Sequence, residues 1–520
     1  MAHASPSLVY GPVTEPLDTT TLGTLIETQA RHYGNRTAVV FPEQQVRRTY
    51  RDLLFRSKLV AKALLHGGLQ HGDCVGIMAG NCYEYIEVFL GAARIGCPVV
   101  VLNSTYTPTE LHRAVTVSRC KLGEASGISE VVLSFTSGTT GAPKAAVLTH
   151  LNVINDGRLI GERMQLSQSD VVCCPPPLFH CFGLVIGFLA SFAHGSSIVF
   201  PSAQFDAEQV LNALVAEECT VLLGVPTMLI ALMDLNRVKQ LKITYLRTAV
   251  AAGAPVPQAV MRRMEEELGL RDTLNAYGMT ETSPVTSMTS LDDSQERRVS
   301  SVGKVLAHTG AKIIDVKGNI VPRGVRGEIC TSGFALQRGY WENEAKTAEV
   351  MKKDADGVMW MHTGDEGLID VEGYLSITGR IKDLIIRGES TRRVNWVATD
   401  TCVGGENIFP AEIEDRLLAH PCIAETAVVG LPDERFGEAV ACFLRQAEDT
   451  SRPKADDVAQ WVQVTLGRHK APKHVFWVGD ADVLEHFPKT GSGKHQKHIL
   501  RDIGARLLAQ RTRPGPRAKL

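Results

Sequence analysis

The sequence of 520 residues has no C-x-x-C pair and no cluster of cysteine and histidine at metal-ligand spacing, although it contains 12 cysteines. Scattered cysteines of this kind are typical of reduced thiols in an intracellular protein, and they argue against a structural zinc site. A formal net charge of −2 provides no overall attraction to nucleic acid or to an anionic membrane. We therefore expect neither a disulfide framework nor a nucleic-acid partner.

Long apolar runs are also missing. The longest, residues 181–193, lies between His180 and His194 and is too short to cross a bilayer. The opening residues, MAHASPSLVYGP, lack the basic-then-apolar order of a secretory signal peptide. The sequence therefore predicts no membrane span and no secretory leader.

Strand-like and helix-like segments alternate over the first half of the chain, which is long enough for two or more domains. Thr49 and Asp52 form a capping-box pattern at the start of one helix. Such alternation predicts a parallel sheet in an α/β domain. Strands are expected at 38–41, 75–78, 99–102, 131–133, 171–174, 197–200, 221–224 and 246–251, and helices at 21–33, 49–66, 83–95, 183–193, 207–217 and 258–268.

Two other patterns follow along the chain. Short β-prone runs separated by turns predict a small β subdomain, and from residue 407 the pattern becomes α+β. We place a boundary at Lys382, which gives domains 1–382 and 383–500 and a flexible basic tail 501–520. The β runs lie at 311–316, 327–331, 368–370 and 374–378, and the later elements at 410–418, 423–431, 439–444 and 458–466.

The most informative stretch is residues 131–150, VVLSFTSGTTGAPKAAVLTH. An apolar run leads into a loop of serine, threonine and glycine, which ends at Lys144 before the chain becomes apolar again. Glycines let backbone N–H groups approach a ligand, hydroxyls add donors, and the lysine adds a mobile positive charge. Together they predict a polyphosphate site, with an ordinary polar hairpin as the alternative. The loop is not a Walker loop, because the spacing G-x-x-x-x-G-K-[ST] is absent.

Four later motifs carry charged or aromatic side chains next to glycine. The YGMTE sequence at 277–281 offers an aromatic ring to stack on a base, a hydroxyl for a phosphate and a carboxylate for Mg²⁺. HTGD at 362–365 adds a carboxylate, GRIKD at 379–383 adds two cations, and PKTGSGK at 488–494 adds a lysine on a glycine turn. Each motif alone could be a plain loop, but their joint order is far more specific.

With these motifs in this order, the sequence resembles the ANL superfamily of adenylate-forming enzymes, and within it the acyl-CoA synthetases. The resemblance extends from about residue 22 to residue 500. It implies an α/β fold with a large N-terminal domain of βαβ subdomains plus a β subdomain, and a small mobile α+β C-terminal domain. It also implies a reaction in which a small-molecule carboxylic acid and ATP give acyl-AMP and pyrophosphate, after which the thiol of CoA displaces AMP. The implied cofactors are ATP, CoA and Mg²⁺.

The resemblance further implies roles for individual residues. Lys494 would be the adenylation lysine, Thr280 would contact the α-phosphate and Glu281 would bind Mg²⁺. His180 would line the acyl pocket, with plain packing as the alternative. The implied cofactor contacts are Thr136, Ser137, Gly138, Thr139, Thr140, Gly141 and Lys144 at the β- and γ-phosphates, Gly253, Ala254, Tyr277 and Gly278 at adenine, Asp365 and Arg380 at the ribose, Lys382 at the hinge, and Gly405, Glu406 and Asn407 near the pantetheine tunnel.

Two segments depart from the family's pattern. Residues 111–133 are too few for the βα unit that the family has there, so the first subdomain should have an uncovered sheet edge and core. Residues 389–403 are inserted directly after the hinge. Each segment is either a natural variant or a gene-model error, namely a skipped exon and a retained intron.

The sequence therefore predicts an acid–CoA ligase acting on a medium-chain fatty acid or a specialised-metabolite acid. One alternative is a luciferase-like or free-standing adenylation enzyme. The other is an inactive ANL-fold binding protein, produced by the deletion and the insertion.

The last three residues, Ala518, Lys519 and Leu520, differ from the S-K-L peroxisomal address only in the first small residue. The preceding RTRPGPR is rich in proline, glycine and arginine, so it should leave the terminus open to a receptor. We therefore expect a peroxisomal import receptor as a partner and a peroxisomal location. A cytoplasmic location is the alternative.

Overall fold

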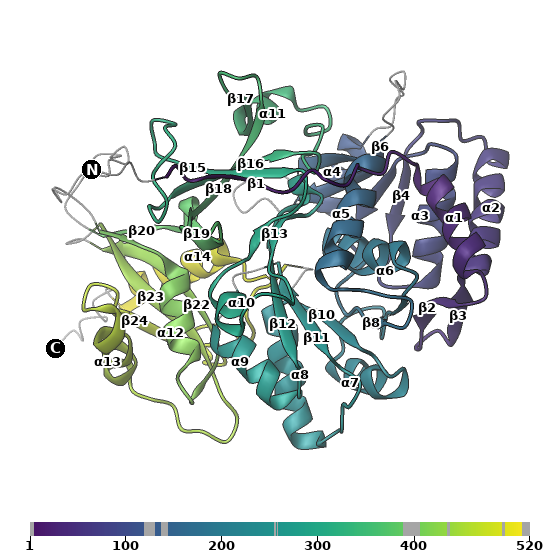
Figure 1. Ribbon diagram of the computed structural model, residues 1–520. Helices are drawn as coiled ribbons and strands as arrows, with labels where there is room; N and C mark the ends of the chain where they lie inside the picture. Colours follow the sequence, from purple (N-terminus) through teal and green to yellow (C-terminus); the bar gives the residue numbers. More distant parts are fainter. Residues whose placement is uncertain are drawn as a thin grey trace, which may run out of the picture.

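The computed structural model describes residues 5–118, 130–136, 144–253, 256, 258–387, 406–433, 437–490 and 494–511. Within these ranges the strands form four sheets (Figure 1). Three of the sheets belong to the N-terminal part of the chain, and the fourth belongs to residues 385–477. A large N-terminal α/β unit with a β subdomain and a smaller C-terminal α+β unit are the predicted fold class, which is confirmed.

The largest sheet has nine strands in the order β14-β13-β12-β11-β10-β8-β9-β2-β3. Strands β12, β11, β10, β8, β9 and β2 run parallel, and the outer strands are antiparallel to their neighbours. The strands are β2 (Thr37–Phe41), β3 (Val46–Thr49), β8 (Val171–Cys173), β9 (Ser197–Val199), β10 (Val221–Gly224), β11 (Thr248–Ala252), β12 (Asp272–Gly278), β13 (Val285–Met288) and β14 (Lys304–Val305).

Both faces of this sheet are buried, as expected for parallel strands. Along β10, Val221 and Leu223 belong to one apolar cluster and Leu222 to the other. The helices that cover the faces are α1 (Leu22–Tyr33), α5 (His150–Arg163), the π-helix η1 (Phe182–Leu189) and α6 (Ala190–Ala193) with the first cluster, and α7 (Ala207–Ala216), α8 (Pro226–Lys239) and α9 (Gln258–Glu267) with the second. Helix α10 (Gln295–Ser300) precedes β14.

A second sheet has four strands in the order β4-β5-β6-β7: β4 (Val75–Met78), β5 (Val99–Leu102), β6 (Glu130–Thr136) and β7 (Lys144–Thr149). Helices α2 (Tyr50–His66), α3 (Tyr83–Arg94) and α4 (Pro108–Val117) belong to this region. The predicted capping box of Thr49 and Asp52 is present at the start of α2. The π-helix occupies the place of the ordinary buried helix predicted at 183–193, and α8 was not predicted.

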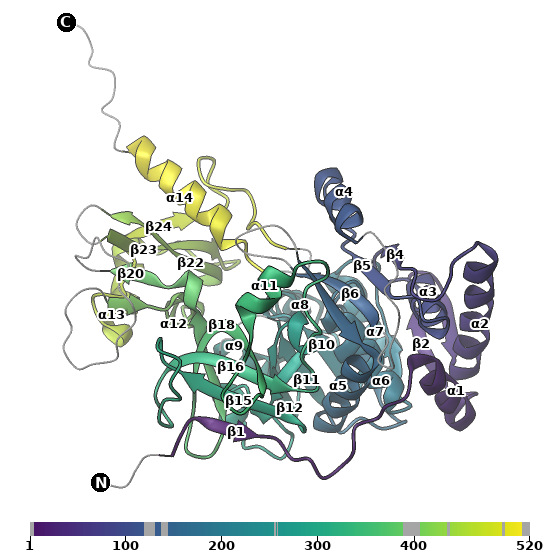
Figure 2. The ribbon, with the colours of Figure 1, turned by 90° about the horizontal axis from the view of Figure 1, so that it is seen from above.

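The sheet of the first subdomain is continuous on both sides of the segment that departs from the family's pattern. Strand β5 pairs in parallel with β6, so no position between them is left empty. The helix α4 nevertheless covers little of this sheet, because Ala114 is its one buried residue. On the edge strand β4, Met78 is 43% exposed. Figure 2 shows α4 at the rim of the molecule.

The β subdomain is a six-stranded antiparallel sheet made of β1 (Leu8–Tyr10), β15 (Thr309–Ile314), β16 (Gly327–Gly333), β17 (Met351–Lys353), β18 (Met359–Ile369) and β19 (Leu375–Arg380). Helix α11 (Glu344–Val350) precedes β17. The predicted short run at 368–370 is the end of the long strand β18. Strand β1 brings the N-terminal residues to an edge of this sheet, where it pairs antiparallel with β15 (Figure 1).

The C-terminal sheet contains β20 (Ile385–Arg387), β21 (Glu406–Ile408), β22 (Ile423–Asp433), β23 (Gly437–Gln446) and β24 (His474–Trp477), with helices α12 (Pro410–Leu418), α13 (Ala455–Leu466) and α14 (Lys497–Arg511). The prediction of a flexible tail from residue 501 is wrong up to residue 511. Those residues belong to α14, because Leu500 and Leu507 are buried beside the β22 side chain Leu431. The three terminal residues of the peroxisomal prediction, and residues 389–403, lie outside the described ranges. None of the described helices is both long and apolar enough to cross a membrane.

Candidate active site

The candidate site lies where parallel strands of the nine-stranded sheet end. Strands β10, β11 and β12 end at Gly224, Ala252 and Gly278, and the carboxyl ends of parallel strands are the usual place for ligands in α/β sheets. Gly253 directly follows β11 with φ +87°, a conformation that L side chains rarely adopt. The backbone here is therefore free to approach a ligand closely.

Gly278 is required by packing. A Cβ atom at this position would lie 1.9 Å from the carbonyl oxygen of Pro284, which no side chain could tolerate. The pairing of β12 with β13 shifts register between Tyr277 and Gly278, and the 3₁₀ turn η2 (Thr280–Thr282) follows. The irregular end of β12 thus carries Tyr277, Thr280 and Glu281 to one edge of the sheet.

Asp365 is a buried carboxylate that joins two of the predicted motifs. The Tyr277 hydroxyl donates to its Oδ2 at 2.8 Å, and the Arg380 Nε lies 3.1 Å from its Oδ1. Burial raises the pKa of Asp365, and the neighbouring Arg380 opposes that rise. The pKa of Arg380 is in turn raised, chiefly by the Asp365 carboxylate. Residues 277, 365 and 380 are therefore brought together as the resemblance implied.

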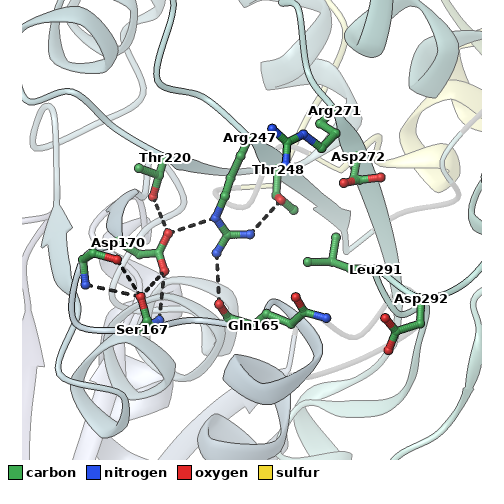
Figure 3. Close-up of a pocket in the computed structure, with 11 residues that line it drawn as sticks. Gln165, Ser167, Asp170, Thr220, Arg247, Thr248, Arg271, Asp272, Leu291 and Asp292 are labelled. Atoms are coloured by element: carbon green, nitrogen blue, oxygen red, sulfur yellow. Dashed lines mark hydrogen bonds and ion pairs between the residues drawn. The ribbon is translucent and has the colours of Figure 1, made fainter.

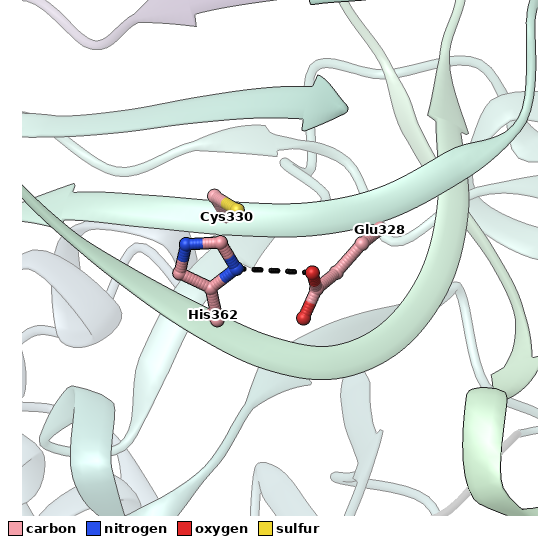
Figure 4. Close-up of side chains that lie close together, drawn as sticks. All are labelled: Glu328, Cys330 and His362. Atoms are coloured by element: carbon pink, nitrogen blue, oxygen red, sulfur yellow. Dashed lines mark hydrogen bonds and ion pairs between the residues drawn. The ribbon is translucent and has the colours of Figure 1, made fainter. Parts of the chain in front are cut away.

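A second carboxylate, Glu328 on β16, holds the turn that carries Asp365. Its Oε2 lies 3.0 Å from His362 Nδ1 (Figure 4). Its Oε1 accepts from the Gly364 N–H at 3.2 Å. Gly364 has φ +70°, so the strand β18 turns sharply just before Asp365. Cys330 completes a group of three possible metal ligands within 4.8 Å of one another. Because both oxygens of Glu328 already have partners, this group is better explained as support for the turn.

Glu281 and Lys144 meet at Tyr340. The Tyr340 hydroxyl donates to Glu281 Oε1 at 2.8 Å, and Lys144 Nζ lies 4.9 Å from the centre of the Tyr340 ring. Glu281 is 8% exposed. Lys144 is the last residue of the predicted polyphosphate loop. The structure therefore places it beside Glu281, the predicted Mg²⁺ ligand. Tyr340 was not predicted; its only signal is the aromatic pair that follows Gly339.

Lys494 reaches this site from the C-terminal part of the chain. A Cβ atom on Gly253 would lie 3.9 Å from Lys494 Cε. Burial, together with the Arg380 guanidinium, lowers the pKa of Lys494 to about 8, and the carboxylates of Asp365 and Glu281 act in the opposite direction. The structure therefore brings Lys494 to the same place as Arg380, Asp365 and Glu281, which come from the N-terminal part.

His180 also lies close to Lys494. Burial and the charge of Lys494 lower the pKa of His180 to about 3, so the imidazole is neutral over the physiological range. The Phe182 N–H donates to His180 Nδ1 at 3.1 Å. A neutral ring held in this way at the reaction centre can line a pocket and accept a hydrogen bond, but it adds no charge.

The structure describes only some of the remaining predicted site residues. Lys382 is exposed in the 3₁₀ turn η3 (Ile381–Asp383), between β19 and β20. The backbones of Thr136, Glu406 and Asn407 lie in strands β6 and β21, and nothing is described of their side chains. The predicted contacts that lie outside the described ranges are Ser137, Gly138, Thr139, Thr140, Gly141, Ala254 and Gly405.

A polar cavity of about 560 Å³ lies elsewhere, at the opposite ends of the same strands (Figure 3). It is lined by Thr220, Thr248 and Asp272, which precede or begin β10, β11 and β12. Arg247 at its centre is fully engaged: Nε lies 2.9 Å from Asp170 Oδ1, and the other nitrogens donate to Thr248 and to backbone carbonyls. This cavity is therefore separate from the site formed by Tyr277, Asp365 and Lys494.

Chemically, the arrangement suits an anionic nucleotide. Lys144, Arg380 and Lys494 supply positive charge, and the main-chain glycine at 253 leaves room for a base. Glu281 offers a single buried carboxylate, and Mg²⁺ is commonly held by one or two carboxylates together with substrate phosphates. The donor set therefore fits Mg²⁺ bound along with ATP.

Comparison with known families agrees with this geometry. The AMP-binding enzyme family matches residues 26–123 and 126–341, and the AMP-binding enzyme C-terminal domain matches residues 412–494. Among curated proteins, the acyl-CoA ligase cnsG of Penicillium expansum is 47% identical over 504 residues, covering 97% of this chain and 98% of its own. The acyl-CoA ligase sidI of Aspergillus fumigatus is 44% identical over 573 residues, covering 97% and 94%. Among solved structures, ATP-bound MatB from Rhodopseudomonas palustris matches with a TM-score of 0.80 at 26% identity, covering 94% of this chain and all of that one.

The chain therefore belongs to the AMP-binding enzyme family, within the ANL superfamily of adenylate-forming enzymes. More particularly, it is an AMP-forming acyl-CoA synthetase, as its full-length similarity to acyl-CoA ligases shows. The rival classes, a luciferase-like enzyme and a non-catalytic relic, are not favoured by these relatives.

The alignment lengths also bear on the shortened first subdomain. The alignment to the Aspergillus ligase is longer than this whole chain, so that relative has segments that are missing here. The alignment to the Penicillium ligase is 504 residues long and covers 97% of the 520 residues, so it contains hardly any gap in this chain. Relative to that ligase, this chain lacks no long segment.

Proposed function

We propose that this acyl-CoA synthetase activates a medium-chain fatty acid or a specialised-metabolite acid with ATP and Mg²⁺, and then transfers the acyl group to CoA. The observation that supports the adenylation step best is the position of Lys494 beside Asp365, Glu281 and Arg380. A cation at that point can stabilise negative charge on the α-phosphate as the carboxylate attacks. Mg²⁺, held by Glu281 and the phosphates, would supply further charge stabilisation.

An apolar acid is supported by the side chains close to the end of the parallel strands. Met228, Val285 and Met288 are at most 6% exposed, and Val225 lies against Gly253. We propose that these side chains line the acyl pocket, because apolar walls bind hydrocarbon by burying its surface. We therefore propose a substrate with an apolar acyl chain.

The second half-reaction requires the C-terminal part to move. In the described arrangement, Lys494 fills the place next to Gly253, and Arg326 of the β subdomain lies 3.3 Å from Glu412 on α12. We propose that the C-terminal part rotates about Lys382, which withdraws Lys494 and admits CoA.

The test is a panel of carboxylic acids assayed in two ways. Pyrophosphate release on adding Mg²⁺, ATP and an acid would measure adenylation, and CoA-dependent thioester formation would measure the transfer. An acid of medium chain length should give both products, and Lys494→Ala is the control that should abolish most pyrophosphate release. Pyrophosphate without thioester would point to a free-standing adenylation enzyme, and neither product with any acid would contradict the proposal.

The peroxisomal location is a separate proposal, supported by the sequence Ala518-Lys519-Leu520. A fluorescent protein fused to the N-terminus should collect in peroxisomes, and deletion of these three residues should release it to the cytosol. Diffuse fluorescence from the undeleted fusion would contradict the assignment.

A further inference from the structure

One buried carboxylate lies beneath the turn that carries Lys494. Glu425 on β22 has a side chain that is 9% exposed and is contacted by three basic residues. Lys489 Nζ lies 2.6 Å and His495 Nε2 lies 2.8 Å from its Oε1, while Arg445 Nε lies 3.1 Å from its Oε2. This is a larger set of charged contacts than one surface ion pair provides.

Two of these partners flank Lys494 in the sequence. Lys489 and His495 face each other as an antiparallel bridge, so they form the two sides at the base of one turn. Within it the Thr490 N–H donates to the Lys494 carbonyl at 2.8 Å, and the Lys494 N–H donates to Thr490 Oγ1 at 3.2 Å. Glu425 therefore contacts both Lys489 and His495, which begin and end the turn, through its Oε1 atom. Lys494 directly precedes His495.

These contacts keep the Glu425 side chain ionised. Burial by itself would raise its pKa, but the hydrogen bond from His495 and the ammonium of Lys489 lower the pKa of Glu425 to about 2. The carboxylate is thus ionised at any pH at which the enzyme would work. A neutral amide of the same shape would fill the space but would lose the attraction to the lysine, histidine and arginine.

Glu425 belongs to a different part of the molecule from the groups that surround the Lys494 ammonium. It comes from the C-terminal sheet, and Lys489 and His495 lie in the same C-terminal part, between β24 and α14, whereas Asp365 and Arg380 come from the β subdomain. We therefore expect Glu425 to affect the reaction through the position of the Lys494 turn.

We propose that Glu425 is a positioning residue that fixes the Lys494 turn for adenylation. This inference rests on the proposed function, in which Lys494 acts in the first half-reaction only. Loss of the charge at 425 should therefore slow adenylation and spare the transfer from acyl-AMP to CoA. A displacement of about 1 Å in a catalytic group can cost roughly a hundredfold in rate, so we expect a loss of adenylation of about 10- to 100-fold.

The matched control is a second buried acid on the same strand. Asp433 at the other end of β22 is 4% exposed at its side chain and is paired with Lys473. Asp433→Asn removes the ion pair with Lys473 at the other end of the strand that carries Glu425. Each variant is first compared with the unaltered protein by thermal unfolding, so that a general loss of folding is recognised.

The decisive measurements use Glu425→Gln, Glu425→Asp and Asp433→Asn in the full-length chain. Glu425→Gln should slow acid-dependent pyrophosphate release by about 10- to 100-fold. Thioester formation from preformed acyl-AMP and CoA should change by less than about twofold. Glu425→Asp should recover part of the loss because the charge returns, and Asp433→Asn should leave both half-reactions unchanged. In a Lys494→Ala background, Glu425→Gln should add no further loss, since the two residues act as one unit.

A second readout needs no substrate. The rate of Lys494 acylation by an amine-reactive reagent, followed by peptide mass spectrometry with Lys473 as an internal reference, should rise in Glu425→Gln because the turn is released. Equal losses in both half-reactions, an additive loss in the Lys494→Ala background, or unchanged labelling of Lys494 would overturn the positioning role. Absence of both half-reactions in the unaltered protein would instead contradict the proposed function, and the labelling result would still decide whether Glu425 fixes the turn.

Discussion

Asp365 and Lys494 meet in one site but are held in place by two regions that are built differently. Asp365 lies on β18 directly after the turn at Gly364, and it is fixed by the hydrogen bond from Tyr277, by the Arg380 ion pair and by Glu328 under that turn. Lys494 is on a turn between β24 and α14, and Glu425 of the same C-terminal part holds that turn through Lys489 and His495. Under the rotation that we propose, the residues around Asp365 would stay together in both orientations, whereas the Lys494 cation would be at the site only in the arrangement described.

The sharpest test of this comparison is Lys494→Ala. Removing one preorganised electrostatic group from a transition state typically costs about 10²–10³ in rate. We expect a loss of that order in adenylation and almost none in thioester formation from preformed acyl-AMP, measured separately in stopped assays. Similar losses in both half-reactions would mean that Lys494 belongs to one permanent site and that the two regions do not act separately.

The opposite pattern is expected for Lys382→Pro. Proline fixes φ and removes the N–H at the turn η3, so it should oppose the rotation that we propose there. Thioester formation should fall by about tenfold or more while adenylation is largely retained. Lys382→Ala, which removes the charge but not the backbone freedom, is the control and should affect both half-reactions little.

A smaller effect should appear in the pH dependence of adenylation. The active form of Lys494 is the protonated one, and its pKa is lowered to about 8, so the charged fraction falls as the pH rises through that value. The kcat/KM for adenylation should therefore decline above about pH 8, and thioester formation should show no such decline. Lys494→Arg keeps a charge at every pH in this range, so a decline that persists in this variant would assign it to another group.

The smallest effect is expected for Glu328→Gln, beneath the turn that carries Asp365. The amide would still contact His362 and the Gly364 N–H, but it would lose the carboxylate charge. Hydrogen bonds to charged groups are worth about 1.5–3 kcal/mol, and part of this is retained by the amide. We expect the KM for ATP to rise by roughly three- to tenfold with kcat nearly unchanged. Glu372→Gln, at an exposed position beyond β18, is the control, and a fall in kcat alone would show that Glu328 does not act through nucleotide binding.

Much of this fold could be predicted because its signals are local. The alternation of apolar strands and amphipathic helices, the capping box at Thr49, and the glycine-bearing motifs all lie within short windows of sequence. Helix α8 was missed because Pro226 at its start follows directly on a strand-like run, and the π-helix η1 was not foreseen because it is apolar all round. Helix α14 was read as part of a tail because its buried leucines are embedded among basic residues.

The site was predicted less completely, since its supporting contacts join residues that are distant in sequence. The motif residues Tyr277, Asp365 and Arg380 could be named from the sequence, and the structure brings them together. Their partners could not be named, because nothing near Glu281 indicates Tyr340 and nothing near Lys494 indicates Glu425. The roles given to the individual motif residues remain predictions until the variants are assayed.

The distance along the chain between the two halves of the site has a consequence for biosynthesis. During translation the residues of the expected nucleotide site up to Arg380 leave the ribosome first, and the cation that we propose for adenylation, Lys494, follows more than a hundred residues later. A nascent chain that ends between these two points would carry the expected ATP contacts of the N-terminal part but would lack the cation that we propose for adenylation. The order of synthesis therefore places the expected onset of adenylation after the C-terminal part that carries Lys494 has been made.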